Sequence, residues 1–253
     1  MSEKQRPSRR NLLLGLGTFA LVGGGWQAWI RRPRALEFTD IDGLPGWRQT
    51  VLDGMSVSRS GLSGVAFAGL DSSADQTDPL PANRLCRTLF EHDIPGKVPV
   101  AAFSDFFCPY CRVLTGRLAE RASDPASDIS ISWHELPLLG PSSIVAAKAA
   151  IAADLQGGYA EFQARLMGGT FRPTARYLTD SASSAGLQAG KLILDMDGQI
   201  VTGRLSRSRA AARTLGIFGT PAIVVGRTLV MGEISDRDLD TLIEMERETP
   251  ARC

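Results

Sequence analysis

The sequence has few residues of the kinds that bind metal ions. Four cysteines and two histidines occur among its 253 residues. A structural zinc site needs four nitrogen or sulfur ligands, which proteins usually supply as two closely spaced pairs. Only one Cys-x-x-Cys pair exists, at Cys108 and Cys111, so further ligands would have to come from widely separated positions. We therefore expect no metal site.

Signatures of nucleotide and nucleic-acid binding are also missing. The sequence contains neither a glycine-rich phosphate loop nor a dinucleotide-binding fingerprint, so we expect no bound organic cofactor. Residues 1–35 carry seven basic side chains and one acidic side chain, which leaves 21 basic and 26 acidic residues for the rest of the chain. Because no basic patch with interleaved aromatic residues occurs there, we expect no nucleic-acid partner.

The N-terminal residues contain a long apolar run. Residues 8–32 read SRRNLLLGLGTFALVGGGWQAWIRR, with arginines on both sides of an apolar stretch. As a helix, residues 12–30 would be about 28 Å long, enough to cross a bilayer. The start of the segment, SRRNLL, resembles a twin-arginine signal. We interpret residues 1–34 as an export signal or an N-terminal membrane anchor, and either one would place the rest of the chain in the periplasm, where disulfides form.

The remainder of the chain alternates between strand and helix patterns. We interpret residues 35–84 as an N-terminal extension and linker that adds a surface strand to the main sheet. The patterns that follow predict a helix at 85–93, a strand at 98–103, a helix at 112–122, a strand at 129–133, helices at 142–155, 159–166, 174–185, 191–195 and 206–215, strands at 222–225 and 228–231, and a final helix at 236–247. This order indicates an α/β fold, in which a small central sheet with helices on both faces is interrupted by a helical insertion.

The Cys-x-x-Cys pair lies where the first predicted strand of this series turns into a helix. A disulfide between Cys108 and Cys111 closes too small a loop to stabilise the fold by restricting the unfolded chain. With Pro109 at the first helical position, Cys108 is the N-cap, where the helix dipole stabilises a thiolate and lowers its pKa. The thiolate is the form that attacks disulfides, and Cys111, nearly one turn later, can resolve the mixed disulfide. The motif therefore favours a redox centre.

Two stretches of the chain resemble the DsbA-like thiol–disulfide oxidoreductases of the thioredoxin superfamily. They are FSDFFCPYC, residues 103–111, and GIFGTPA, residues 216–222. The resemblance implies a DsbA-like thioredoxin domain over residues 85–253. The long interval between the two stretches implies that a helical insertion separates the half of the fold with the CxxC motif from the half with a cis-proline.

The resemblance also assigns roles to residues around Cys108 and Cys111. The implied residues that shape the active site are Pro109, Tyr110, Thr220 and Pro221, with Pro221 in the cis form. Backbone groups of Thr220 would pair with an extended substrate. Many relatives carry an acidic residue at the end of the first strand, where this chain has Ala102. We therefore expect water or Asp105 to relay the proton of the resolving thiol.

The other two cysteines lie far apart in the sequence. Cys253 is in the C-terminal tail, and in an oxidising compartment a disulfide with Cys86 would tie this tail to the domain. The alternative is a free thiol that packs as a small apolar residue. We adopt the structural disulfide as the hypothesis.

Three functions are compatible with these residues. In the first, an exported oxidant passes its Cys108–Cys111 disulfide to reduced or misoxidised exported proteins, and a membrane redox partner reoxidises it. The disulfide then serves in place of any other cofactor. In the second, a membrane donor keeps the pair reduced, and the protein is a reductase or isomerase. In the third, the cysteines hold a chaperone substrate or a soft metal ion such as Cu(I) without turnover. The DsbA-like insertion implied by the resemblance favours the first.

Overall fold

The computed structural model describes residues 36–57, 79–91, 93–169, 172 and 174–248. The expected signal or anchor at 1–34 lies outside these ranges, and within them no helix is both long and apolar enough to cross a membrane. The strands are β1 (Thr39–Asp40), β2 (Arg48–Val51), β3 (Ser56–Val57), β4 (Val98–Ser104), β5 (Ile129–Glu135), β6 (Gly219–Thr220), β7 (Ala222–Val225) and β8 (Thr228–Met231). The helices are α2 (Ala82–Leu89), α3 (Pro109–Ser123), α4 (Pro141–Asp154), α5 (Tyr159–Gly168), α6 (Ala175–Ser184), α7 (Ala189–Asp195), α8 (Gln199–Thr214) and α9 (Asp236–Glu248).

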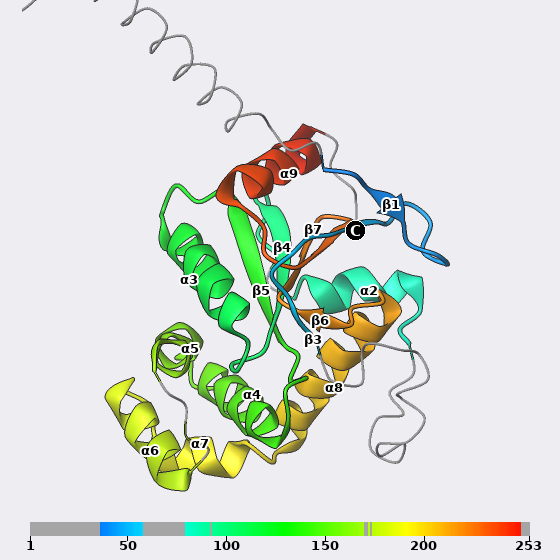
Figure 1. The fold of residues 1–253 in the computed structure, drawn as a ribbon. Coiled ribbons are helices and arrows are strands. Elements are labelled where there is room, and N and C mark those ends of the chain that lie inside the picture. Colours follow the sequence, from blue (N-terminus) through cyan, green and yellow to red (C-terminus); the bar gives the residue numbers. More distant parts are fainter. Residues whose placement is uncertain (1–35, 58–78, 92, 170–171, 173, 249–253) are drawn as a thin grey trace, which may run out of the picture. The chain divides into compact units, whose positions relative to one another are not determined.

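A six-stranded mixed sheet forms the centre of the fold, in the order β1-β2-β8-β7-β4-β5 (Figure 1). β4 runs parallel to β5 and antiparallel to β7, and β7 forms the predicted antiparallel hairpin with β8. β2 runs parallel to β8, so the N-terminal extension adds a strand to the main sheet, as the sequence predicts. A second, two-stranded sheet pairs β3 with β6.

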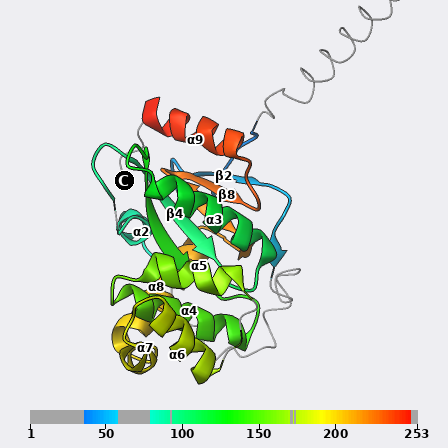
Figure 2. The same ribbon diagram turned by 90° about the vertical axis from the view of Figure 1, so that its left-hand side faces the viewer.

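Strand β4 is covered on both faces of the sheet, which explains its nearly continuous apolar sequence, VPVAAFS. On one face, α2 and α8 share a core with the strand through Leu85, Ala211 and Phe103. On the other face lie α3 and α9, which Arg117 and Asp236 connect by an ion pair (Figure 1, Figure 2). β4, which lies between β7 and β5, therefore leads the chain from the interior of the sheet directly to the start of α3.

The helical insertion consists of α4 to α7 together with the first part of α8 (Figure 2). Its core is built from apolar side chains of several helices, among them Phe162, Leu166 and Leu192. Cys108 and Cys111 belong to this same core. The insertion therefore packs directly against the Cys-x-x-Cys motif.

Several elements are longer than their sequence patterns predict, and α8 and β5 show why. α8 begins at Gln199 rather than at residue 206, although the added segment QIVTGRL contains a glycine and β-branched residues, which are weak helix formers. Burial of Val201 and Leu205 compensates for this low propensity, because packing supplies most of the stability of helices in proteins. β5 continues beyond Trp133 to Glu135, because these last residues still pair with β4.

Candidate active site

The two cysteines lie at the start of α3, where β4 has just ended. Helix α3 begins at Pro109, as predicted, and Cys108 is its N-cap residue. The Cys111 backbone N–H donates to Cys108 Sγ at 3.3 Å, so the sulfur takes the place of the oxygen that usually caps a helix. Cys108 is 1% exposed and Cys111 is fully buried. Both carry free thiols in this structure.

The environments of the two sulfurs push their pKa values in opposite directions. A hydrogen bond from the Cys111 thiol is the main reason why the pKa of Cys108 falls from 9.0 to about 6, against the opposing effect of burial. Hydrogen bonds involving Ser56 and Thr220 lower this pKa further. Burial raises the pKa of Cys111 well above its ordinary value, and the neighbouring Cys108 adds to the rise. At neutral pH the pair therefore consists of one thiolate and one thiol, which is the arrangement that thiol–disulfide exchange requires.

The loop before β7 forms the second wall of the site. The peptide bond between Thr220 and Pro221 is cis, and Cys108 Sγ lies 3.2 Å from the Thr220 carbonyl oxygen, to which it donates when it is protonated. Thr220 is buried, whereas the two residues flanking Cys108 on the surface, Phe107 and Tyr110, are 39% and 38% exposed. Phe218, at the other side of the loop, is 41% exposed. The segments on both sides of the site thus expose apolar side chains, whereas Cys108 itself is buried.

Asp105 connects the motif to the helical insertion. Its carboxylate accepts four hydrogen bonds, from the backbone N–H groups of Phe107, Leu138 and Leu139 and from the Ser143 hydroxyl, at 2.7–2.9 Å. Its own backbone N–H lies 3.5 Å from Cys111 Sγ. The geometry shows that the carboxylate holds the Cys-x-x-Cys loop in place. The role of Asp105 in proton relay stays a prediction.

Ser56 is a site residue that the sequence analysis did not identify. Strand β3 pairs antiparallel with β6 so that Ser56 lies opposite Thr220, and the Ser56 hydroxyl is close enough to Cys108 to lower the pKa of its thiol. Gly54, just before the strand, packs beside the aromatic ring of Tyr110. A Cβ atom on Gly54 would lie 3.4 Å from Tyr110 Cδ1. No local sequence pattern predicts the contact between β3 and the active site, because it joins segments that are far apart in the sequence.

Glu135 is a second residue that the sequence analysis missed. It is the last residue of β5, pairs with Ser104 of β4, and is 2% exposed. The Tyr159 hydroxyl donates to Glu135 Oε1 at 2.5 Å, while Oε2 has no hydrogen-bond partner within the described part of the chain. Burial raises the pKa of Glu135 to about 8, with the hydrogen bond from Tyr159 opposing the rise and the Asp105 carboxylate adding to it. With this pKa, the Glu135 carboxyl group is mostly protonated at neutral pH.

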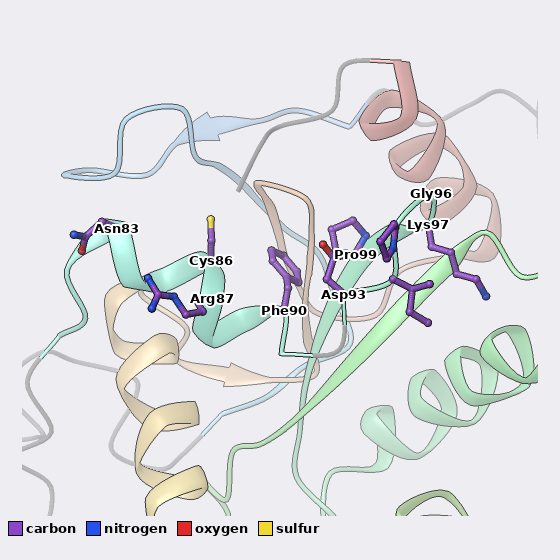
Figure 3. Close-up of a pocket in the computed structure, with 10 residues that line it drawn as sticks. Asn83, Cys86, Arg87, Phe90, Asp93, Gly96, Lys97 and Pro99 are labelled. Carbon is purple, nitrogen blue, oxygen red and sulfur yellow. The ribbon is translucent and has the colours of Figure 1, made fainter.

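A cavity of about 640 Å³ lies elsewhere, between α2 and the loop that precedes β4 (Figure 3). None of its lining residues belongs to the Cys108–Thr220 site. Cys86, which lines it, takes part in a disulfide bond. Cys253 lies outside the described residues, so the Cys86–Cys253 pairing stays a prediction. In the parts of the chain that the structure describes, no three His, Cys, Asp or Glu side chains are grouped to hold a metal ion.

Comparisons with known proteins agree with this geometry. The family model of the DSBA-like thioredoxin domain matches residues 99–244. A solved thioredoxin-like oxidoreductase from Silicibacter pomeroyi DSS-3 is 32% identical, with a TM-score of 0.58 over 64% of this chain and 98% of that chain. Two further solved structures are below 25% identity and show the fold alone. The thiol-disulfide exchange protein alpha-DsbA2 from Wolbachia pipientis is 19% identical, with a TM-score of 0.59 over 64% of this chain and 92% of that one. A periplasmic thioredoxin-like protein from Salmonella enterica serovar Typhimurium is 22% identical, with a TM-score of 0.57 over 67% of this chain and 99% of that one.

One curated protein is also similar. The Na(+)/H(+) antiporter NhaA of Herminiimonas arsenicoxydans is 25% identical over 151 residues, which make up 60% of this chain. The chain spans only 24% of the length of that antiporter.

Proposed function

Since the chain belongs to the DsbA-like thioredoxin domain family and is a thiol–disulfide oxidoreductase, we propose that it acts in the periplasm as an oxidant. In this role it passes the Cys108–Cys111 disulfide to reduced exported proteins. The observation that carries the proposed direction is the opposite shift of the two thiol pKa values. A thiolate that is stable at neutral pH stabilises the reduced form of the pair, and a stabilised reduced form makes the disulfide oxidising.

The same asymmetry determines which sulfur is attacked. A substrate thiolate attacks Cys108 Sγ and forms a mixed disulfide, and the Cys108–Cys111 bond breaks. The electron pair goes to Cys111, which takes up a proton because its pKa is high. A second substrate thiolate then attacks the substrate sulfur of the mixed disulfide. Cys108 leaves as a thiolate, for which its low pKa makes it a good leaving group. The substrate is oxidised by two electrons, and the enzyme pair is reduced by two.

The surroundings of the sulfurs support a polypeptide substrate. Phe107, Tyr110, Val113 and Phe218 are exposed apolar side chains on the two segments that carry Cys108 and the cis-proline, and we treat them as an apolar rim of the site. Unfolded exported chains expose apolar side chains that such a rim can bind. Reoxidation of the reduced pair requires an acceptor for two electrons, and we assign this role to a membrane redox partner. The signal or anchor expected at residues 1–34 and the periplasmic relative support this location.

The reduction potential of the full chain tests the proposed direction. The protein is equilibrated with mixtures of reduced and oxidised glutathione, quenched with acid, alkylated and weighed by mass spectrometry. We expect a potential above the poise of a cytosolic glutathione pool, about −220 to −260 mV. A potential well below that range would assign the protein to the reductases or isomerases. No exchange at all would favour a binding module without turnover.

A further inference from the structure

Strand β3 pairs with β6, the strand whose Thr220 carbonyl oxygen contacts the Cys108 sulfur. We propose that β3 occupies the place of a substrate strand, and that the Ser56 hydroxyl stands where the sulfur of the reacting substrate cysteine lies. Ser56 is then a residue that positions and stabilises the Cys108 thiolate in the resting enzyme, and a substrate enters by replacing β3. This inference rests on the proposed exchange with polypeptide substrates, but it concerns an occupant that the chain itself supplies.

The backbone contact has the geometry of a bound extended peptide. β3 runs antiparallel to β6, with Ser56 opposite Thr220 and residue 57 opposite Gly219 (Figure 1). Extended peptides add to exposed sheet edges by main-chain hydrogen bonds in this manner. The edge of β6 that β3 occupies lies directly beside Cys108, because Thr220 carries the carbonyl oxygen that the Cys108 thiol contacts. A second strand cannot pair with this edge while β3 is in place.

The side chain of Ser56 lies where the proposal puts the reacting side chain of a substrate. Ser56 lies opposite Thr220, whose carbonyl oxygen is 3.2 Å from Cys108 Sγ, and the Ser56 hydroxyl is close enough to this sulfur to lower the pKa of Cys108. The hydroxyl is therefore near the atom that a substrate thiolate attacks. Serine and cysteine differ only in that oxygen replaces sulfur. Cys108 is 1% exposed, although Phe107 and Tyr110 on either side of it are more than a third exposed. Disulfide exchange requires access to the sulfur, so the resting arrangement has to open before a substrate can react.

The chain is anchored firmly before β3 and lightly at β3 itself. The Leu52 N–H donates to the Met231 carbonyl at 2.7 Å, and the Glu233 N–H donates to the Asp53 carbonyl at 2.9 Å. Between these two contacts, Gly232 with φ +100° approaches the chain so closely that a Cβ atom would lie 2.4 Å from Leu52 O. Gly54 follows, with φ +76°, and the pairing after it covers only two residues. The anchored part can therefore stay in place while β3 moves off the edge.

A cysteine introduced in place of Ser56 tests the placement directly. In the full chain carrying Ser56→Cys and Cys111→Ser, oxidised glutathione first reacts with one thiol and releases reduced glutathione. The second thiol then displaces the bound glutathione and forms a disulfide between the introduced sulfur and Cys108, so that two thiols and one oxidised glutathione yield one disulfide and two reduced glutathiones. We expect this internal disulfide to be the main product, identified by mass and peptide mapping.

A matched control places the new cysteine on the same segment but away from the sulfur. Asp53 is exposed and lies three positions before Ser56. In Asp53→Cys with Cys111→Ser we expect Cys108 to end as a mixed disulfide with glutathione. The same product in the Ser56→Cys variant would overturn the proposal. This result would leave the oxidant role untouched, because the measurement needs no protein substrate. Conversely, a reducing potential would remove the oxidant role and leave the position of β3 unaffected.

A kinetic comparison tests whether β3 has to be displaced. Ser56→Pro with Val57→Pro removes both N–H donors of β3, while Ser56→Ala removes only the hydroxyl. We expect the double proline variant to react with an extended cysteine-containing peptide about 5- to 30-fold faster than the original protein, the factor that a weak local interaction contributes. We expect Ser56→Ala to show no such gain and to shift the pH midpoint of Cys108 alkylation upward. Equal rates for the double proline variant and the original protein would overturn the proposal.

Discussion

The reduction potential of the Cys108–Cys111 pair should depend on pH in two distinct regimes. Reduction adds two electrons and as many protons as the two product thiols retain. Below pH 6 both thiols keep their protons, so the potential falls by about 59 mV per pH unit. Above pH 6 Cys108 is a thiolate and only Cys111 binds a proton, so the slope is halved to about 30 mV per pH unit.

The size of the effect at neutral pH follows from the same pKa. At pH 7 a Cys108 pKa of about 6, in place of 9.0, favours the reduced form by about 1.4 kcal/mol, which equals about 30 mV for a two-electron couple. Ionisation of Cys108 therefore supplies one moderate part of the oxidising power. The remainder has to come from interactions that differ between the reduced and the oxidised pair.

The assay is equilibration with glutathione between pH 4.5 and pH 8.5, followed by acid quenching, alkylation and mass measurement, with a correction for the ionisation of glutathione itself. We expect a change of slope near pH 6. Ser235→Ala, which alters an exposed serine that caps α9, is the control and should leave the change of slope in place. A constant slope of about 59 mV through pH 8 would refute the reasoning, because it would mean that Cys108 remains protonated.

Three further variants probe the supports of the site. Asp105→Ala removes a buried carboxylate that accepts four hydrogen bonds. We expect the free energy of unfolding of the oxidised protein, measured in urea, to fall by about 3 kcal/mol. The control is Asp236→Ala, which removes an exposed ion-pair partner and should lower the free energy of unfolding by less than about 1 kcal/mol. Glu135 binds its proton more tightly in the folded protein, so the free energy of unfolding should fall by at most about 5 kcal/mol as the pH rises from about 4.5 to about 8. Glu135→Gln, unfolded in urea at pH 5 and pH 8, should lack this fall. If the variant kept the pH profile of the original protein, the raised pKa of Glu135 would be contradicted. Gly232→Ala forces a Cβ against Leu52 O at φ +100°, and we expect a loss of about 1–3 kcal/mol in the same urea assay; a neutral result would show that the contact is loose.

The sequence alone predicts the architecture and the position of the cysteine pair. A compact apolar run before FFCPYC indicates the buried strand β4, and Pro109 marks the first residue of α3. These features are local, because a strand pattern, an N-cap and a proline at the first helical position depend on neighbouring residues only. The helical insertion is likewise predicted, from the succession of helical patterns before residue 222.

The features that the sequence did not predict depend on contacts between distant segments. Ser56 belongs to a stretch, VLDGMSV, that carries no signal of chemistry, and it acquires a role only by pairing with Thr220. Glu135 follows the strand pattern ISISW as an apparent loop residue. It becomes a buried acid because β5 continues beside Ser104 and because Tyr159 of the insertion reaches it. Burial by a separate part of the chain changes the pKa of a carboxyl group without leaving any mark in the adjacent sequence.

The parallel pairing of β2 with β8 sets an order for folding. Arg48 and its partner Thr228 are 180 residues apart, so this pair closes a far longer loop than the β7–β8 hairpin does. Long-range pairing has to overcome loop-closure entropy first, and ribosomes release the N-terminal strand long before its partner. We therefore expect the first strands synthesised to be among the last to dock. β3 in turn pairs with β6, whose residues Gly219 and Thr220 are also synthesised late. Until β6 is in place, β3 has no partner strand, and a newly made molecule passes through a stage in which its reactive sulfur is open before the finished fold closes over it.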